Sequence, residues 1–427
     1  MTLHDFGPFP EAVGYDRAVE LDVADPLRTH RDRYVHTDDD LIYLDGNSLG
    51  RLPKQAITLI EDVTHRQSGD RLIRSWNEGW WELQLELGDL LAPLIGVSSG
   101  EVIISDSTSV NLYKLALSAI QAAPERSRIV TDDLNFPTDV YILEGIANQH
   151  DKELVIVPSD GIHGPLEGLE NELDKRTALV ALSHTVFKSG YTYDMAEINE
   201  MAHRHGALTL WDCSHSVGVV PIALSESKSD LAIGCTYKYL NGGPGSPAFL
   251  YVRSELQNVL ENPISAWWAH AEPFEFDLEF RPTSGIRQFH TGTMPTLSLA
   301  AAGAGITDVA NAGLEAIRAK SAALTDFLIG QWEDHLRPLG FVLASPSDPN
   351  RRGSHISLAH EEALSITRAL IDIGQVLPDF RSPDNIRFGL SPLYNQFVEV
   401  HTAVQRLKRI VEASEHAAFT VVSSVVT

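Results

Sequence analysis

Residues 233–246 read Ile-Gly-Cys-Thr-Tyr-Lys-Tyr-Leu-Asn-Gly-Gly-Pro-Gly-Ser, an apolar stretch that runs into one lysine between two tyrosines and then into a glycine-rich loop. Burying a lysine is costly, so a lysine at the end of a core strand requires a reason. A desolvated lysine has a lowered pKa and can form a Schiff base with an aldehyde. The alternative is a lysine whose stem lies on apolar surface while its amine reaches water. Lys238 is therefore the first candidate catalytic residue.

Short apolar runs alternate with helical stretches on both sides of this segment. The pattern predicts helices at 111–120, 139–149 and 196–205, and strands at 101–105, 128–131, 153–157, 178–182, 207–211, 230–233 and 247–252. This alternation predicts an α/β domain whose central sheet is mostly parallel and covered on both faces. Such sheets bind ligands at the carboxyl ends of their strands.

The texture of the chain changes near residue 300. A long helical region at 300–331 is followed by short strands at 355–358 and 385–388 and a helix at 398–413. Residues 1–40 are polar, acidic and irregular. We expect a large domain at 41–300, a smaller α+β domain at 301–427, and an N-terminal segment, 1–40, that packs with the smaller domain.

Composition restricts the class of partner. The 427 residues are 43% hydrophobic and 21% charged, with a formal net charge of −25, which argues against nucleic acid or an anionic membrane surface. No secretory signal and no apolar run of about 20 residues is visible, so we expect a cytoplasmic protein without a membrane span. The two cysteines lie in apolar surroundings and fit a reducing compartment. We expect no metal site.

Three further segments carry polar groups to the ends of predicted strands. Asp212 ends a strand, where its carboxylate can pair with the protonated ring nitrogen of a pyridine-type cofactor. An aspartate in this position is equally often the N-cap of the next helix. Ser107, Thr108 and Ser109 stand at the start of a helix. The free N–H groups there can bind a phosphate, or the serine and threonine side chains can simply cap the helix. Phe136 can stack on a flat ring, or Pro137-Thr-Asp139 can be a plain helix start.

These features together favour pyridoxal 5′-phosphate (PLP), the aldehyde cofactor that most widely uses a lysine Schiff base. Arg387, in Arg387-Phe-Gly-Leu-Ser-Pro-Leu-Tyr394, can clamp a carboxylate with its planar fork, or it can be an exposed salt-bridge arginine. No phosphate-binding GxxxxGK[ST] loop, dinucleotide fingerprint or HExxH motif is present.

The chain resembles the kynureninase family, which belongs to the fold-type-I PLP enzymes, along nearly its whole length. The resemblance is carried by the lysine segment 234–245, Leu44-Asp-Gly-Asn-Ser-Leu-Gly50, Leu72-Ile-Arg-Ser-Trp-Asn77, Asn135-Phe-Pro-Thr-Asp139, Asp212-x-x-His215 and Arg387-Phe-Gly-x-x-Pro-Leu-Tyr394. It implies an aspartate-aminotransferase-like fold and an enzyme of the kynurenine pathway of tryptophan catabolism, connected with NAD biosynthesis.

The resemblance also implies residue roles. Lys238 would hold PLP, Phe136 would stack on its ring, Asp212 would pair with the ring nitrogen, and Asp139 would support the ring region. The other cofactor contacts would be Thr108, Ser109, Pro137, Thr138, Ser183, His215 and Tyr237, with Trp267 and Thr293 supplied by the neighbouring subunit of a homodimer. Arg387 would grip the substrate carboxylate, and Asn47 and Trp76 would lie on the substrate side.

The implied reaction is hydrolytic cleavage of L-kynurenine, or a ring-substituted kynurenine such as 3-hydroxykynurenine, to anthranilate or its derivative and L-alanine. Tyr237 is the candidate acid/base beside Lys238, although a phenol with a pKa of ~10 needs help to act as a base. Ala266-Trp-Trp-Ala-His270 departs from the family's usual Gly-Trp-Phe-Gly-His, which leaves the ring substituents open. Alternatives are an aminotransferase or desulfurase of the same fold, or a PLP-binding regulator without turnover.

Overall fold

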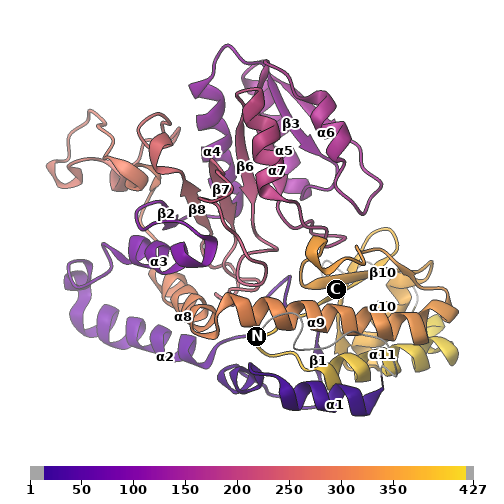
Figure 1. Ribbon diagram of the computed structural model, residues 1–427. Helices are drawn as coiled ribbons and strands as arrows, with labels where there is room; N and C mark the ends of the chain where they lie inside the picture. Colours follow the sequence, from indigo (N-terminus) through magenta and orange to yellow (C-terminus); the bar gives the residue numbers. More distant parts are fainter. Residues whose placement is uncertain (1–13, 420–427) are drawn as a thin grey trace.

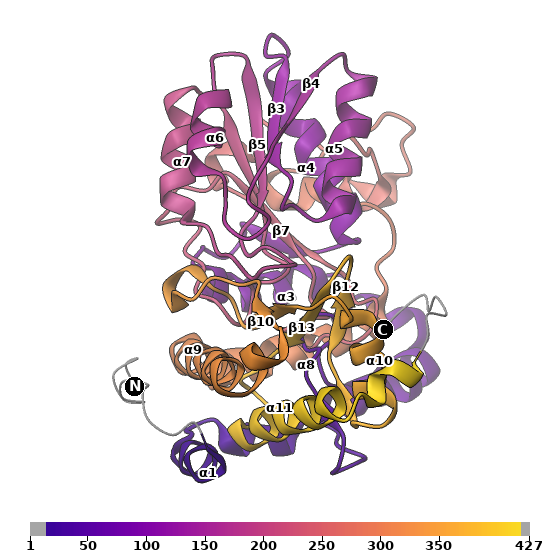
Figure 2. The same ribbon diagram turned by 90° about the vertical axis from the view of Figure 1, so that its right-hand side faces the viewer.

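The computed structural model describes residues 14–419, which form a large α/β body and a smaller sheet-and-helix body (Figures 1 and 2). A seven-stranded sheet forms the centre of the large body. Its strand order is β2 (Val102–Ile104), β8 (Phe249–Val252), β7 (Leu231–Gly234), β6 (Leu208–Asp212), β5 (Thr177–Ser183), β3 (Arg128–Asp132) and β4 (Glu153–Val157).

The five strands from β7 to β4 pair in parallel, whereas β8 runs antiparallel to both β7 and β2. Polar side chains at the carboxyl ends of the parallel strands therefore meet at one edge of the sheet. The predicted fold class, an α/β protein with a mostly parallel central sheet, is confirmed.

Alternate residues of each strand face opposite layers of helices. In β5, Leu179 and Ala181 join the core under α4 (Thr108–Ala122) and α5 (Pro137–Gln149). Val180 and Leu182 join the core under α6 (Leu166–Glu172) and α7 (Met195–Arg204). Because both faces of the inner strands are covered, β5, β7 and β8 are continuous apolar runs and do not show the alternating pattern of a half-exposed strand.

The smaller body is built on a four-stranded antiparallel sheet. Its order is β12 (Asp379–Arg381), β13 (Asn385–Gly389), β10 (His355–Ala359) and β9 (Val342–Leu343). One separate core joins this sheet to α9 (Leu314–Gln331), α10 (Ala363–Asp372) and α11 (Phe397–Glu412). A short parallel pair, β1 (Ile42–Tyr43) and β11 (Val376–Leu377), brings the segment before Asp45 to this body.

The structure corrects two sequence expectations. The region 300–331 is two helices, α8 (Thr296–Ala312) and α9, because Gly313 takes a φ of 81° that interrupts the helix. The segment before residue 40 is not wholly irregular, since α1 (Tyr15–Ala24) packs against α11 through Ala18 and Leu21 (Figure 1). Both residues lie on one face of α1, but a stripe this short gives little periodicity to detect.

The division at residue 300 remains a prediction. That position falls inside α8, which packs against α2 (Lys54–Asp62) and α3 (Leu83–Leu91) of the large body. Residues 1–13 of the proposed N-terminal segment lie outside the described residues. No helix within residues 14–419 has the length and apolar character needed to cross a membrane.

Candidate active site

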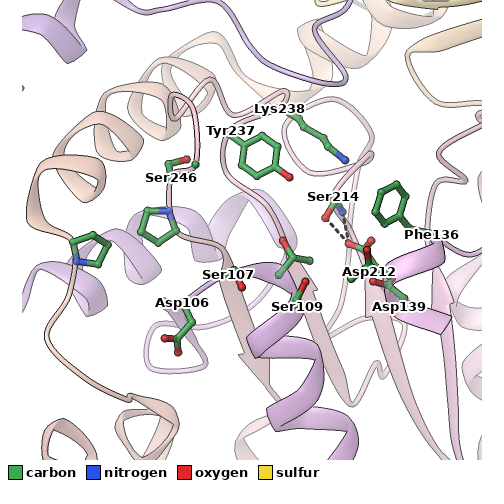
Figure 3. Close-up of a pocket in the computed structure, with 15 residues that line it drawn as sticks. Asp106, Ser107, Ser109, Phe136, Asp139, Asp212, Ser214, Tyr237, Lys238 and Ser246 are labelled. Atoms are coloured by element: carbon green, nitrogen blue, oxygen red, sulfur yellow. Dashed lines mark hydrogen bonds between the residues drawn. The ribbon is translucent and has the colours of Figure 1, made fainter. Parts of the chain in front are cut away.

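A cavity of about 470 Å³ lies at the carboxyl edge of the large sheet (Figure 3). The loops after β2, β3, β6 and β7 supply most of its lining. Among the residues predicted from the sequence, its walls contain Thr108, Ser109, Phe136, Thr138, Asp139, Asp212, Tyr237 and Lys238. The topology therefore gathers these side chains, which are spread over 131 positions of the chain, counting from Thr108 to Lys238, at one place.

Lys238 points its amine into this cavity, toward Phe136 (Figure 3). Its Nζ lies 3.1 Å from Nε2 of His215 and 5.9 Å from the centre of the Phe136 ring. Burial is the main cause that lowers the pKa of Lys238, and the charges of Arg387 and Arg381 lower it further. Burial and Lys238 likewise lower the pKa of His215. A neutral imidazole beside an easily deprotonated amine suits a nucleophile and proton carrier.

Two aspartates face each other on the opposite wall. Asp212 Oδ1 accepts hydrogen bonds from the backbone N–H of Ser214 (2.8 Å) and from its hydroxyl (2.6 Å). Asp139 is 3% exposed, and its Oδ2 has no hydrogen-bond partner. Burial, followed by the charge of Asp212, raises the pKa of Asp139 well above the usual range. Asp212, which lines the cavity and is oriented by two hydrogen bonds, fits a bound cationic ring nitrogen.

The far end of the cavity is suited to an anion. Ser107 caps α4 by accepting a hydrogen bond from the N–H of Val110 at 3.3 Å, so Thr108 and Ser109 lie in the first turn with free N–H groups. Ser246 closes the cavity on the other side. This end can therefore take an anion, and phosphate binding by Thr108 and Ser109 stays a prediction.

Phe136 presents an aromatic ring on one side of the cavity. Phe136 is 39% exposed, and its ring meets Phe187 edge-on at 5.2 Å between centroids. Pro137 begins α5, fixes the helix start and does not line the cavity. Ser183 lies behind the wall, 3% exposed, and donates a 2.6 Å hydrogen bond to the side-chain oxygen of Asn135. Ser183 therefore supports the loop that carries Phe136.

Tyr237 lines the cavity beside Lys238, with its hydroxyl directed inward (Figure 3). The pKa of this phenol is raised, first by proximity to Cys235 and next by burial. A raised pKa keeps the hydroxyl protonated, so in this setting Tyr237 is better suited to donate a proton than to remove one.

The candidate substrate residues occupy the boundary between the two bodies. Arg387 is 1% exposed and forms an ion pair with Asp379, with its Nε 2.9 Å from Oδ1. The side-chain amide of Asn47, oriented to satisfy its neighbours, accepts from Arg387 Nε at 2.9 Å and donates to Asp45 at 3.3 Å. Arg387 is thus not a free cation in this arrangement.

Three predicted residues lie away from this cavity within one chain. The ring of Trp76 packs at 5.0 Å from the ring of Trp268, which stacks on Trp81 at 4.4 Å. Trp267 packs against Trp81 at 6.0 Å and remains 40% exposed. Thr293 is also exposed, and neither Trp267 nor Thr293 lines the cavity.

Sequence reasoning missed several contributors. Lys114 is fully buried and forms a 2.7 Å ion pair with Asp106, which lines the cavity near the start of α4. Ser214 orients Asp212 through a hydrogen bond. Asp379 forms ion pairs with both Arg387 and Arg381. Asp-x-Ser after a strand is a detectable turn signal, but the partner of Arg387 depends on strand pairing. Among the described residues, no group of three or more His, Cys, Asp or Glu side chains is arranged to hold a metal.

Comparison with solved structures identifies the fold. The apo cysteine desulfurase of Thermococcus onnurineus superposes with a TM-score of 0.75 at 19% identity, covering 88% of this chain and 96% of its own. The C-DES mutant with glycine covalently linked to its PLP cofactor gives a TM-score of 0.75 at 18% identity, covering 86% and 97%. The chain has the fold of fold-type-I PLP enzymes.

Sequence comparison narrows this class to one family. Residues 317–407 match the model of the kynureninase C-terminal domain. The kynureninase of Pseudomonas fluorescens is 42% identical over 399 residues, 92% of this chain and 94% of its own. That of Burkholderia pseudomallei is 41% identical over 406 residues, covering 93% and 95%. This chain belongs to the kynureninase family.

Proposed function

We propose that this protein is a PLP-dependent hydrolase that cleaves L-kynurenine, or a ring-substituted kynurenine, with water to an anthranilate and L-alanine. Two observations together support the proposal. The chain is similar to kynureninases over 92% of its length, and Lys238, Asp212 and Phe136 line one cavity. This activity would place the protein in tryptophan catabolism by the kynurenine pathway, connected with NAD biosynthesis, in the cytoplasm.

The residues present fit PLP. Lys238 would bind its aldehyde carbon, Asp212 its ring nitrogen, Phe136 one face of its ring, and the first turn of α4 its phosphate. When bound, PLP supplies an electron sink for negative charge that develops on the substrate. Asp139, held protonated by burial and by Asp212, would keep the wall beside the ring nitrogen from carrying a second negative charge.

The protein side chains would handle protons at stated positions. The amine of Lys238, with its lowered pKa, would remove the proton from the substrate α-carbon, and neutral His215 would hold that amine in place. The hydroxyl of Tyr237 would deliver a proton to the β-carbon as the aryl-bearing fragment leaves, in agreement with its raised pKa. Arg387, which is already paired with Asp379, would contribute to holding the carboxylate.

The test is an assay of purified protein with PLP and L-kynurenine, with anthranilate fluorescence and L-alanine as readouts. We expect both products in equal amounts, no products with D-kynurenine, and none with Lys238→Ala. Comparison of L-kynurenine, 3-hydroxykynurenine and methylated kynurenines would define the ring preference. Absence of cleavage with every kynurenine would refute the proposal.

A desulfurase function is not favoured by the cysteines. A desulfurase needs an accessible thiol on a loop, whereas Cys213 and Cys235 are the two cysteines of the chain and both are buried. Burial raises the pKa of each thiol, which makes thiolate formation unfavourable.

A homodimer with a shared active site is the second part of the proposal. The segment after β8 projects from the body (Figure 1) and exposes Phe274 at 66%, Phe276 at 79% and Leu278 at 102%. An apolar projection of this kind suits burial against a second copy. Trp267 and Thr293, which do not reach the cavity of their own chain, would then complete the site of the neighbouring subunit.

Hybrid dimers test this sharing. Lys238→Ala and Trp267→Ala are each expected to have little activity, because each homodimer lacks one component of both sites. Subunit exchange between the two variants should restore activity, since one site of a hybrid contains both wild-type residues. Mixtures that form hybrids without regaining activity would contradict a shared site.

A further inference from the structure

Two arginines meet at one aspartate where the smaller sheet borders the active site. Asp379 and Arg387 are direct partners across β12 and β13, and Arg381 ends β12. Arg387 donates to Asp379 through Nε (2.9 Å to Oδ1) and through Nη2, while Arg381 Nη2 lies 2.6 Å from Asp379 Oδ2. Asp379 and Arg387 are fully buried, whereas the side chain of Arg381 is 34% exposed.

The hydrogen bonds of Arg387 leave little for a substrate. A guanidinium has five N–H donors. Its Nε and one Nη2 donor serve Asp379, the second Nη2 donor serves the Ser48 hydroxyl at 2.9 Å, and one Nη1 donor serves the Phe187 carbonyl at 2.5 Å. One N–H on Nη1 remains, but a bidentate grip on a carboxylate requires two parallel donors. Arg387 therefore needs a second group to hold a carboxylate.

Arg381 has the donors that Arg387 lacks. Its Nε is buried and has no hydrogen-bond partner, and its Nη1 reaches the Phe380 carbonyl only at 3.5 Å. The cluster adjoins the cavity wall, because Arg387 donates to the Phe187 carbonyl at 2.5 Å and the Phe187 ring meets the ring of Phe136 at 5.2 Å between centroids. The charges of Arg381 and Arg387 also lower the pKa of Lys238. An unsatisfied buried donor on a partly exposed cation beside the active site is well placed for an anionic ligand.

The net charge of this cluster suits the binding of one anion. Asp379 neutralises one of the two guanidinium groups. Asp45 lies beside them, and burial with repulsion from Asp379 raises its pKa to about 7. When Asp45 is protonated, one positive charge stays uncompensated in a buried setting, which favours a single carboxylate.

We propose that Arg381, together with the remaining N–H of Arg387, binds the α-carboxylate of the substrate, and that Asp379 is the positioning residue that holds the two guanidinium groups side by side. The inference rests on the proposed function only in requiring an amino-acid substrate. It adds Arg381 to the substrate site and explains why an arginine already paired with an aspartate can still take part.

The test compares ligands that differ only in the carboxylate. L-alanine and ethylamine are titrated into the PLP-loaded enzyme and followed by the visible absorbance of the cofactor. Loss of a charge-assisted hydrogen-bonding group should weaken L-alanine binding to Arg381→Gln by about 10- to 100-fold, with ethylamine binding unchanged. With L-kynurenine, KM should rise by a similar factor while kcat changes little.

Two further variants control the result. Arg337→Gln removes an exposed arginine that pairs with Glu333, and it should bind both ligands as the wild type does. Arg381→Lys keeps the charge but loses the planar fork, so its L-alanine affinity should fall between those of wild type and Arg381→Gln. Arg381→Lys also decides the matter if Arg381→Gln does not fold.

Unchanged L-alanine affinity in a folded Arg381 variant would overturn the proposal, and so would equal weakening of L-alanine and ethylamine. If the wild type fails to cleave kynurenines but its L-alanine affinity still depends on Arg381, the proposed function fails and the role of Arg381 stands. If kynurenine is cleaved and KM is the same in Arg381→Gln, Arg381→Lys and wild type, the proposed function stands and the role of Arg381 fails.

Discussion

Removal of the buried ammonium of Lys114 should destabilise the end of the cavity at which α4 begins. Lys114 is completely buried on α4, and its Nζ donates to Asp106 Oδ2 at 2.7 Å and to the Phe289 carbonyl at 2.7 Å. Asp106 has a φ of 52° and also accepts from the hydroxyl of Thr291 at 2.7 Å. Lys114→Met preserves most of the side-chain volume and deletes the charge.

The magnitude follows from what remains around Asp106. Removing one partner of a fully buried ion pair costs ~3–5 kcal/mol. Asp106 is 20% exposed and keeps hydrogen bonds from Thr291 and Ser105, so we expect a lower cost, about 2–3 kcal/mol. At an unfolding entropy of roughly 2.1 cal/mol/K per residue, this cost lowers Tm by about 2–3 °C in a chain of this length.

The assay is thermal and denaturant unfolding of the cofactor-free protein, together with PLP titration. Lys114→Met should bind PLP more weakly, because the unpaired Asp106 carboxylate faces the end of the cavity that suits phosphate. The double variant Asp106→Asn, Lys114→Met should recover most of the lost stability, since it leaves no unpaired charge. Wild-type stability in the single variant, or a double variant less stable than the single one, would refute this reasoning.

Three other predictions follow from the structure. Lys238→Ala should fold, with unchanged circular dichroism, but should lose the borohydride-stable cofactor adduct that peptide mapping locates at this residue in wild type; an adduct elsewhere would contradict the assignment. The pKa of Asp45 is raised from its ordinary 3.8 to about 7, so the native state favours the protonated carboxyl and loses stability as pH rises from about 4 to 7; Asp45→Asn should lack this loss, and equal urea-unfolding losses between pH 5 and pH 8 in both proteins would contradict it. Gly305→Ala should cost at least ~1–3 kcal/mol and weaken PLP binding, because the new Cβ would lie 1.9 Å from the Leu240 carbonyl in the loop after Lys238; a variant with wild-type Tm and PLP affinity would show that this contact can relax.

Local patterns in the sequence predicted much of the architecture. The inner strands of the large sheet are short apolar runs, because a strand buried on both faces needs apolar side chains on both. The break at Gly313 and the helix α1 were missed, because one glycine in an alanine-rich stretch and a stripe formed by Ala18 and Leu21 are weak local signals.

The sequence by itself determined the fold class and the family, and it identified Lys238, Asp212 and Phe136 as candidates, since parallel strands deliver the residues that follow them to one edge. Tertiary structure alone decided which partners these residues meet. The contact of Lys238 with His215 joins residues 23 positions apart, and the bond from Ser48 to Asp379 joins residues 331 apart. The donors left free on Arg387 and Arg381 depend on such long-range contacts, and because packing of separate elements creates them, no local pattern encodes them.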